Sequence, residues 1–337
     1  MKPNIEYTES KGHTVKQCPG TSHDYLCCGY HVINHVEGCP IDCTYCILQF
    51  YLDAGKTVIH SDTENIITEI EEKIATQPHR FFRIGTGELS DSLVYDNTTN
   101  FSSQLIELFR DIPNAMLELK TKTNNIRNLI GLNHGEKTVI SWSVNPPAII
   151  AKEERNSATL DERLEAIKII QNEGYLLGLH FDPMLDFPGW QTDYPELVNR
   201  LFSVIRPERV AWISIGSLRF PPEMKEKVLE KFPESKIMYG ELVRGMDGKM
   251  RYLKPMRIAM YQILYEALRR IDKKMFIYFC MESPEIWERI MRWTPKSNEH
   301  LDFLFAKSLN ERFPGLIHEK PQQNFYNSGI PLHKNTE

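Results

Sequence analysis

The sequence contains no apolar run near the roughly 20 residues that a membrane-spanning helix needs. Its first residues, MKPNIEYTESKGHTVKQ, are too polar for the core of a signal peptide. Hydrophobic residues make up 41% of the chain and charged residues 25%, which is ordinary for a soluble globular protein. These observations predict a cytoplasmic protein with no membrane partner.

Cysteine is scarce, with seven residues in 337. Thiols stay reduced in the cytoplasm, so clustered cysteines there are expected to be metal ligands or redox groups rather than disulfides. Several catalytic signatures are also missing: there is no HExxH motif, no Walker loop and no Ser-His-Asp order. The segment GTGELS, residues 85–90, lacks the third glycine of a dinucleotide-binding fingerprint.

Positive charge is low overall but unevenly distributed. The net charge of -5 argues against nucleic-acid binding by the whole surface. Residues 219–274 nevertheless contain 14 Lys or Arg against 8 Asp or Glu, a balance of +6 that leaves -11 for the rest of the chain. This stretch is therefore either a solvated charged face or a candidate for a face that binds nucleic acid.

The pattern of apolar residues predicts an α/β protein. Buried strands are expected at residues 30–36, 80–86, 115–121, 137–144, 175–181 and 209–216, with helix-like segments between them. The first of these helices has Ser61 and Glu64 at the spacing of a capping box. Strands that alternate with helices imply parallel βαβ units, either in an open doubly wound sheet or in a partial barrel. In both folds the chemistry is expected at the carboxyl ends of the strands.

The pattern changes after residue 216. Residues 236–253 predict a β-hairpin with Asp247-Gly248 in the turn, and helices are expected at about residues 255–271, 284–293 and 299–313. We find no repeat and no low-complexity linker. The expected organisation is an N-terminal extension over residues 1–29, one domain over residues 30–319, and a loose tail over residues 320–337.

Three of the seven cysteines lie within the segment EGCPIDCTYCILQ, residues 37–49. Cys39, Cys43 and Cys46 follow the first predicted strand, and three thiolates on one loop can hold three irons of a 4Fe-4S cluster. The fourth iron is then free to bind a small molecule such as S-adenosylmethionine (AdoMet). The alternative is a structural zinc site with His31 or His35 as the fourth ligand.

Other polar residues also follow predicted strands, where a ligand is expected. Glycines in GTGE allow a close approach of the backbone to a ligand. His180 and Asp182 end the fifth strand, where they either face a pocket or are satisfied by local hydrogen bonds. The remaining strand-end residues are Gly85, Gly87 and Glu88, Lys120 and Lys122, and Ser143 and Asn145.

Several segments, taken in order, resemble the spore photoproduct lyase family. They are GCPIDCTYCILQ, LELKTKTNNI, WSVNP, LDERLEAIKIIQNEGYLLGLHFDPM and FPPEMKEKVLEKFPESK. Members of this family are radical AdoMet enzymes that repair a thymine dimer in DNA. The resemblance runs from about residue 30 to about residue 290, and it implies a partial (β/α)6 barrel with a C-terminal hairpin and helices. It also implies an electron donor such as a flavodoxin or a ferredoxin.

The resemblance assigns roles to individual residues. Cys39, Cys43 and Cys46 match the cluster ligands, and GTGE resembles a Gly-Gly-Glu segment that cradles AdoMet. Arg251 and Tyr252 match a pair on the hairpin that approaches the lesion, with Lys249 and Arg244 as further nucleic-acid contacts. The expected AdoMet-binding residues are Gly85, Gly87, Ser90, Lys122, Ser143 and Asn145, and the expected catalytic residues are Tyr45 and Glu88.

Two positions depart from the family pattern. Glu88 stands where the lyases have a cysteine that returns a hydrogen atom to the product radical, and Ile47 stands where they have a tyrosine. Cys18, Cys27, Cys28 and Cys280 remain as other thiols, although isolated cysteines usually behave as small buried hydrophobes. Glu282, next to Cys280, is either a pocket carboxylate or part of a helix start.

Three hypotheses follow from the sequence. The first is a radical AdoMet enzyme that acts on a thymine-dimer lesion in DNA. The second keeps the cluster and the radical chemistry but has a different substrate, because the donor cysteine is replaced. The third is a nucleic-acid-binding protein whose cysteine loop holds a structural zinc.

Overall fold

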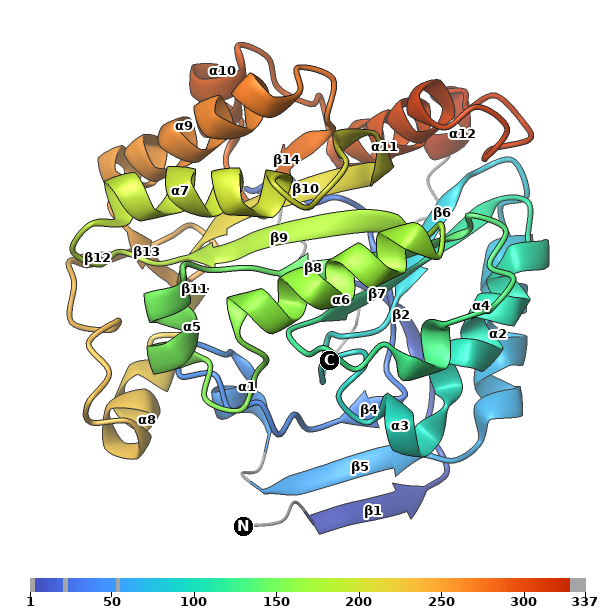
Figure 1. Cartoon of the computed structure of the whole chain (residues 1–337), viewed down its shortest axis with the longest axis horizontal. Helices are drawn as coiled ribbons and strands as arrows, with labels where there is room; N and C mark the ends of the chain where they lie inside the picture. The colour runs from blue at the N-terminus through green and yellow to red at the C-terminus, as the bar shows by residue number, and fades with distance from the viewer. Residues whose placement is uncertain (1–3, 21–23, 53–54, 328–337) are drawn as a thin grey trace.

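The computed structural model describes residues 4–20, 24–52 and 55–327. Its centre is an eight-stranded sheet (Figure 1). In spatial order the strands are β14 (Ile277–Phe279), β10 (Val210–Ser217), β9 (Leu176–Met184), β8 (Thr138–Ser143), β7 (Ala115–Thr121), β6 (Phe82–Gly85), β3 (His31–Ile33) and β2 (Val15–Gln17).

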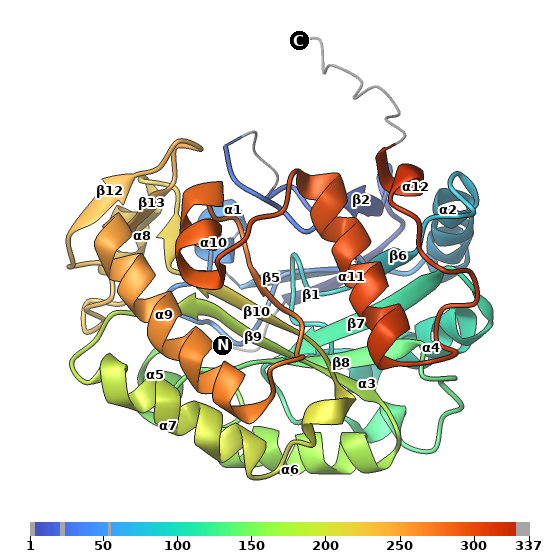
Figure 2. The ribbon, with the colours of Figure 1, turned by 90° about the horizontal axis from the view of Figure 1, so that it is seen from above.

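The six predicted strands are all present as β3, β6, β7, β8, β9 and β10, and neighbouring strands pair in parallel. The sequence analysis did not predict β14, which pairs in parallel with β10. At the other edge, β2 pairs antiparallel with β3, so a segment of the expected N-terminal extension joins the main sheet. The predicted partial barrel is confirmed, because the sheet curls but its edge strands, β14 and β2, do not pair (Figure 2).

The two faces of the curled sheet differ in polarity because side chains alternate along each strand. In β7, Leu117 and Leu119 are buried on one face, whereas Glu118 points to the other and bonds to Ser141 of β8. The register places Lys120 beside Ser141, and Ser143 beside His180 of β9. The inner face of the half-barrel is therefore polar at its centre.

Helices cover the apolar outer face, as α6, α7 and α9 show along one side (Figure 2). The helices are α1 (Leu48–Tyr51), α2 (Thr63–Ala75), α3 (Asp96–Thr99), α4 (Phe101–Asp111), α5 (Pro147–Glu153), α6 (Leu160–Asn172), α7 (Trp190–Phe202), α8 (Met224–Lys231), α9 (Lys254–Ile271), α10 (Pro284–Met291), α11 (Asn298–Arg312) and α12 (Asn324–Asn327). The predicted C-terminal helices are confirmed as α9, α10 and α11.

Helix α11 crosses the inner face rather than the outer one (Figure 2). Its Phe305 packs edge-on against Trp212 of β10, with ring centroids 6.0 Å apart. The guanidinium of Arg83 in β6 lies 3.4 Å from the centre of the Phe305 ring. Arg83 also bonds to Asp302 of the same helix at 3.3 Å. Helix α11 thus closes one end of the half-barrel.

Two small sheets flank the half-barrel. One pairs β1 (Asn4–Thr8), β5 (Lys56–His60) and β4 (Val36–Glu37), and the other pairs β11 (Arg219–Phe220), β13 (Met250–Tyr252) and β12 (Leu242–Arg244). Strands β12 and β13 form the predicted hairpin, with the turn at residues 245–249. The hairpin begins at Leu242 and not at residue 236, since residues 236–241 form no strand.

The predicted capping box of α2 is wrong. The helix begins at Thr63, and no side chain caps it. The Asp62 carboxylate instead accepts a hydrogen bond from the backbone of Ser10 at 3.0 Å, since the segment after β1 packs against this turn.

The tail prediction lies partly outside the described residues, at 328–337. Residues 320–327 include α12, where the Tyr326 hydroxyl accepts a hydrogen bond from the backbone of Phe81 at 3.2 Å. Among the helices that the structure describes, none is both long and apolar enough to cross a bilayer.

Gly85, at the end of β6, gives a test of how tightly the inner face is packed. A Cβ at this position would overlap the Tyr30 hydroxyl and the backbone carbonyl of Glu118. We expect Gly85→Ala to lower the free energy of unfolding by about 1–3 kcal/mol, measured by urea denaturation. The matched control is Gly240→Ala, where nothing lies within 4 Å of the added carbon. Equal stability of the two variants would contradict this packing.

Candidate functional site

The loop that carries Cys39, Cys43 and Cys46 lies between β4 and α1, at the carboxyl edge of the half-barrel. The loop after β6 holds its start, because the backbone of Gly38 donates to the Leu89 carbonyl at 2.9 Å. The Ser90 hydroxyl donates to the Gly38 carbonyl at 2.8 Å. Gly38 has a φ of +109°, and a Cβ there would lie 2.5 Å from the Lys56 carbonyl. Only glycine suits this turn.

The segment 153–154, at the end of α5, holds the middle of the loop. Cys43 and Glu154 form an isolated antiparallel bridge. The backbone of Thr44 donates to the Glu153 carbonyl at 2.9 Å, and the Thr44 hydroxyl donates to the Glu153 carboxylate at 2.5 Å. Strand β8 leads directly into α5, so the loop is tied to the end of β8.

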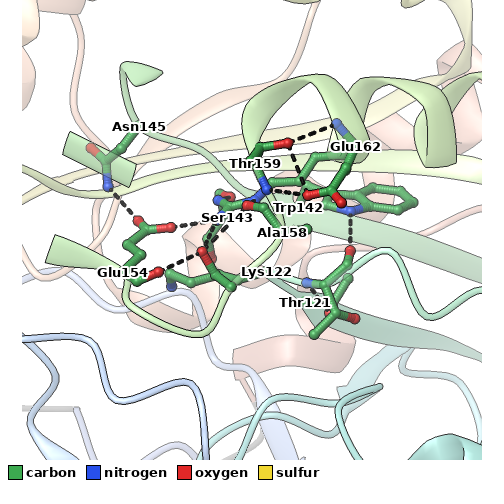
Figure 3. Close-up of polar contacts among 12 residues, drawn as sticks. Thr121, Lys122, Trp142, Ser143, Asn145, Glu154, Ala158, Thr159 and Glu162 are labelled. Carbon is green, nitrogen blue, oxygen red and sulfur yellow. Dashed lines mark hydrogen bonds and ion pairs between the residues drawn. The ribbon is translucent and has the colours of Figure 1, made fainter. Parts of the chain in front are cut away.

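A buried polar network surrounds Tyr45. Its hydroxyl donates to Glu154. The Asn145 side-chain amide donates to the same carboxylate at 3.1 Å (Figure 3). The other carboxylate oxygen of Glu154 accepts from Arg163 of α6 at 2.5 Å. The hydroxyl of Tyr194 in α7 donates to the side-chain amide oxygen of Asn145 at 3.1 Å. The network fixes the orientation of the loop relative to three elements of the barrel.

Glu154 is ionised in this network. Burial would raise its pKa, but the charges of Arg163 and Lys122 and the bond from Tyr45 lower it on balance. Burial and the Glu154 charge raise the pKa of Tyr45, so Tyr45 stays protonated and donates. The Arg163–Glu154 pair is fully buried, and Arg163 also bonds to the carbonyl of Ser143 at 2.8 Å.

The three thiols lie close enough to influence one another electrostatically. Cys43 is buried, whereas Cys39 and Cys46 are partly exposed. Burial raises the pKa of each thiol, and that of Cys39 reaches about 12. The Lys122 ammonium lies 5.8 Å from the centre of the Tyr45 ring, and its charge opposes the rise at Cys43 and Cys46.

The donor set on the loop consists of three thiols, and cysteine thiolates are the usual ligands of iron–sulfur clusters. His31 and His35, the fourth ligands in the zinc hypothesis, pack against Phe82 and Phe101.

The residues expected to bind AdoMet lie along the same edge. Gly87 has a φ of +96°, and its loop is held by Ser92, which accepts from the backbone of Lys120 at 2.9 Å. Asp91 accepts from the backbone of Lys122 at 2.6 Å, which joins the loop after β6 to the end of β7. Ser143 and Asn145 are buried at the end of β8. Gly85, by contrast, lies against Tyr30 and Glu118 inside the barrel.

Glu88 extends from the loop after β6 towards the segment after β3. Its carboxylate accepts a hydrogen bond from the Asn34 amide at 3.0 Å, and the residue is half-buried. A carboxyl group lacks the weak S–H bond from which a thiol donates a hydrogen atom. In this structure Glu88 instead forms a hydrogen bond with Asn34.

Further polar groups on the inner face form two clusters. Glu118 accepts from His180 at 2.8 Å and from Trp212 at 3.0 Å. Burial would raise the pKa of Glu118, but His180, Ser141 and Lys120 lower it on balance to about 2. Nearer the carboxyl edge, Arg219 forms a bidentate pair with Asp182 at 2.9 and 3.0 Å.

The residues expected to contact nucleic acid differ in how far they are exposed to solvent. Arg251 is buried, and its guanidinium bonds to Asp247 at 2.5 and 2.8 Å and stacks 4.2 Å from the centre of the Tyr25 ring. Tyr252 is also buried and accepts from the backbone of Asp186 at 3.0 Å. Lys249 is half-buried beside Asp247, whereas Arg244 is exposed.

Part of the basic excess in residues 219–274 is thus neutralised internally. Arg219, Arg251 and Arg257 pair with Asp182, Asp247 and Glu282. The pairing also explains Glu282, a buried carboxylate that accepts from Arg257 at 2.8 Å. The exposed basic residues at the hairpin are Arg244 on β12 and Lys254 just after β13, and Lys254 pairs with Glu285.

His35 lines a small cavity between β3 and α4 together with Thr86 and Phe101. Its ring lies 4.0 Å from that of Phe101, and neither ring nitrogen has a hydrogen-bond partner among the described residues. Burial lowers the pKa of His35 to about 4. The ring is therefore neutral in the folded protein at neutral pH.

The low pKa of His35 predicts a loss of stability in mild acid. Below its ordinary pKa of about 6.5, His35 takes up a proton in the unfolded chain but not in the folded one, so unfolding becomes easier as the pH falls. Between about pH 7.5 and pH 5 this residue should cost about 2 kcal/mol. We expect His35→Phe to reduce the fall in unfolding free energy by that amount, measured by urea denaturation. An unchanged pH slope in the variant would contradict the prediction.

Several residues that build the site were not foreseen from the sequence. They are Glu154, Arg163, Thr44, Glu153 and Tyr194. Glu153 and Glu154 lie over 100 residues from the loop that they hold, and no local motif connects them. A weak signal existed for Glu118, since Glu118 and Lys120 alternate with Leu117 and Leu119 in the predicted strand.

Comparison with known proteins identifies the family. Residues 27–280 match the family model of spore photoproduct lyase. The spore photoproduct lyase of Clostridium acetobutylicum is 26% identical over 225 residues, which is 65% of this chain and 66% of the relative. That of Bacillus subtilis (strain 168) is 24% identical over 230 residues, 66% of this chain and 67% of the relative. The chain thus matches about two thirds of the length of these relatives.

The fold is similar to solved structures of the same family. A double mutant of spore photoproduct lyase with bound AdoMet and dinucleoside spore photoproduct gives a TM-score of 0.74 at 19% identity, with 82% of each chain covered. Spore photoproduct lyase complexed with dinucleoside spore photoproduct gives a TM-score of 0.73 at 19% identity and the same coverage. The match of the family model over most of the chain shows that this protein belongs to the spore photoproduct lyase family of the radical AdoMet superfamily.

Proposed function

We propose that this protein is a radical AdoMet enzyme in which Cys39, Cys43 and Cys46 bind a 4Fe-4S cluster. The observation that carries the proposal is a single loop with three thiols at the carboxyl edge of the half-barrel, held by Ser90 and Glu154. The bound cluster would supply the electron that cleaves AdoMet to a 5′-deoxyadenosyl radical, which abstracts hydrogen from a substrate. The partner that reduces it would be a flavodoxin or a ferredoxin.

The residues of the chain have separate tasks in this proposal. Glu154 and Asn145 fix Tyr45 and so keep the thiols in place. Lys122, Ser143 and the loop at Gly87 offer polar groups to AdoMet, and the Lys122 ammonium suits its carboxylate. The polar inner face around Lys120 and the Asp182–Arg219 pair would receive the substrate.

For the substrate we propose a thymine-dimer lesion in DNA. Family membership supports this choice, and the exposed Arg244 on the hairpin could contact a phosphate. A second candidate is a different substrate for the same radical. Two observations favour it: Glu88 stands at the position of the donor cysteine, and Arg251 is already paired with Asp247.

Anaerobic reconstitution with iron and sulfide tests the class of enzyme. We expect a brown protein that forms 5′-deoxyadenosine from AdoMet when dithionite is added. A colourless protein with stoichiometric zinc would reject the proposal.

An oligonucleotide that contains the spore photoproduct tests the substrate. Restored thymines, detected after digestion, would support DNA repair. Cleavage of AdoMet without repair would reject the lyase assignment and leave the second candidate.

A further inference from the structure

Strand β7 and the residue after it carry two lysines on the inner face of the half-barrel. Glu118 points inwards, where it bonds to Ser141, whereas Leu119 lines the cavity between β3 and α4 on the outer side. Side chains alternate along a strand, so Lys120 and Lys122 extend to the same side as Glu118. Strand β7 pairs with β6 on one side and with β8 on the other, so it lies well inside the edges of the sheet (Figure 1).

Lys120 differs from its basic neighbours in having no counter-charge. Carboxylates hold three other basic side chains of the inner face, namely Arg83, His180 and Arg219. The Lys120 ammonium, in contrast, forms no ion pair and no hydrogen bond with any residue that the structure describes, although the side chain is half-buried. Burial of a charge without a partner is costly, so an anionic ligand would stabilise this group.

The second lysine already has a task in the proposed function. The Lys122 ammonium lies 5.8 Å from the centre of the Tyr45 ring, beside the cysteine loop, where it suits the carboxylate of AdoMet. Lys120 comes two residues earlier, on the side of Glu118 and the barrel centre. Its charge is therefore left for the substrate.

The surroundings of Lys120 hold its backbone firmly and leave its side chain room. The backbone N–H donates to the Ser92 hydroxyl at 2.9 Å, and the carbonyl accepts from the backbone of Ser92 at 3.1 Å. On the other side the register places Ser141 of β8 beside Lys120, and Ser143 follows on the same face. Both of these β8 side chains are small, so they do not cover the ammonium.

The charge of Lys120 reaches both the cysteine loop and the far side of the inner face. Burial raises the pKa of Cys46, and Lys120 is one of the charges that oppose this rise. Burial would also raise the pKa of Asp182, but Arg219 and, more weakly, Lys120 lower it on balance. Lys120 thus lies between the thiols and the Asp182–Arg219 pair, where a substrate would meet the radical.

We propose that the Lys120 ammonium binds the phosphodiester within the thymine-dimer lesion and so positions the lesion on the inner face. The inference rests on the proposed function. The bases and sugars of the two linked thymidines are neutral, and the phosphodiester between them carries the single negative charge. A lysine ammonium is a compact point charge that suits a phosphate oxygen. Lys120 is therefore a specificity residue for a charged, dinucleotide form of the lesion.

A neutral analogue of the lesion tests this contact. The probes are dinucleotide spore photoproducts, one with the natural phosphodiester and one with an uncharged methylphosphonate in its place. Calorimetry measures their binding to the reconstituted protein with AdoMet but without a reductant, so that no turnover occurs. We expect Lys120→Met to weaken binding of the phosphodiester about 10–100-fold and to change binding of the methylphosphonate less than about twofold. Equal losses for the two probes, or no loss, would overturn the proposal.

Two further variants separate the charge from effects on folding. Lys120→Arg keeps the charge and should keep the preference for the phosphodiester. Lys168→Met removes an exposed lysine on the outer helix α6 and should change neither affinity. The native protein alone gives the test if Lys120→Met does not fold, because it should bind the phosphodiester about 10–100-fold more tightly than the methylphosphonate. Equal affinity for the two probes would overturn the proposal, as would a Lys120→Met variant that loses AdoMet binding to the same extent.

Failure of the proposed function gives a different result. A native protein that prefers the phosphodiester but cleaves no AdoMet after reduction would reject the radical chemistry and leave the Lys120 contact in place. Repair of the lesion with equal affinity for both probes would overturn the contact alone. A native protein that binds neither probe would overturn both the lesion substrate and this inference.

Discussion

Cys43→Ala is expected to abolish the cleavage of AdoMet. Cys43 is the most buried of the three loop thiols, and its backbone forms the bridge to Glu154. Loss of an outer partner of a metal ligand typically costs roughly 10–100-fold in activity or affinity, and loss of a ligand itself should cost more. We therefore expect the rate of 5′-deoxyadenosine formation to fall by more than about 100-fold.

The measurement is chromatography of 5′-deoxyadenosine after reduction with dithionite, together with the absorbance of the loop cluster. Tyr51→Phe is the matched control, because Tyr51 lies just beyond the same loop but is 58% exposed. The assignment of the cluster ligands is wrong if Cys43→Ala and Tyr51→Phe form 5′-deoxyadenosine at similar rates.

Glu154→Gln is expected to cause the largest loss of stability. The Glu154–Arg163 pair is fully buried, so neutralising the carboxylate leaves the Arg163 charge without its counter-ion in a medium of low polarity. Breaking such a pair costs about 3–5 kcal/mol, which urea denaturation would record as a lower free energy of unfolding. Replacing both partners, with Glu154→Gln and Arg163→Met, should restore part of this loss.

Glu165→Gln is the control, since the Glu165–Lys168 pair is exposed on α6 and should contribute less than about 1 kcal/mol. Glu154→Gln should also lower AdoMet cleavage at temperatures where the protein stays folded, because Glu154 positions Tyr45. A variant that is destabilised but fully active would limit Glu154 to a structural role.

The local sequence was sufficient to predict much of the fold. Each of the six predicted strands is a short apolar run, and its burial in a parallel sheet depends mainly on those residues. β14 was missed because only three residues pair, within an apolar run that a buried segment of any kind would share. The capping box failed because the helix begins one residue later than expected: Asp62 and not Ser61 is its N-cap, and the Asp62 carboxylate bonds to Ser10.

The candidate site was likewise predicted only in part from the sequence. The cysteine spacing and the strand-end polar residues are local patterns, so the loop and its neighbours along the carboxyl edge could be predicted. The partners of Arg251 could not, because the approach of Tyr25 and the fold of the hairpin turn bury it. A charged residue in a basic stretch looks the same in sequence whether it is exposed or paired.

The sequence by itself determined the thiol motif, the alternation of strands and helices, and the family. Tertiary structure alone decided which residues meet: Glu154 at Tyr45, Arg219 at Asp182, and Leu26 at Glu282. The physical reason is that spacing along a chain specifies local geometry, whereas these contacts depend on the curl of the sheet. That curl brings the segment before β3 and the end of β14 together, where Leu26 and Glu282 form a bridge.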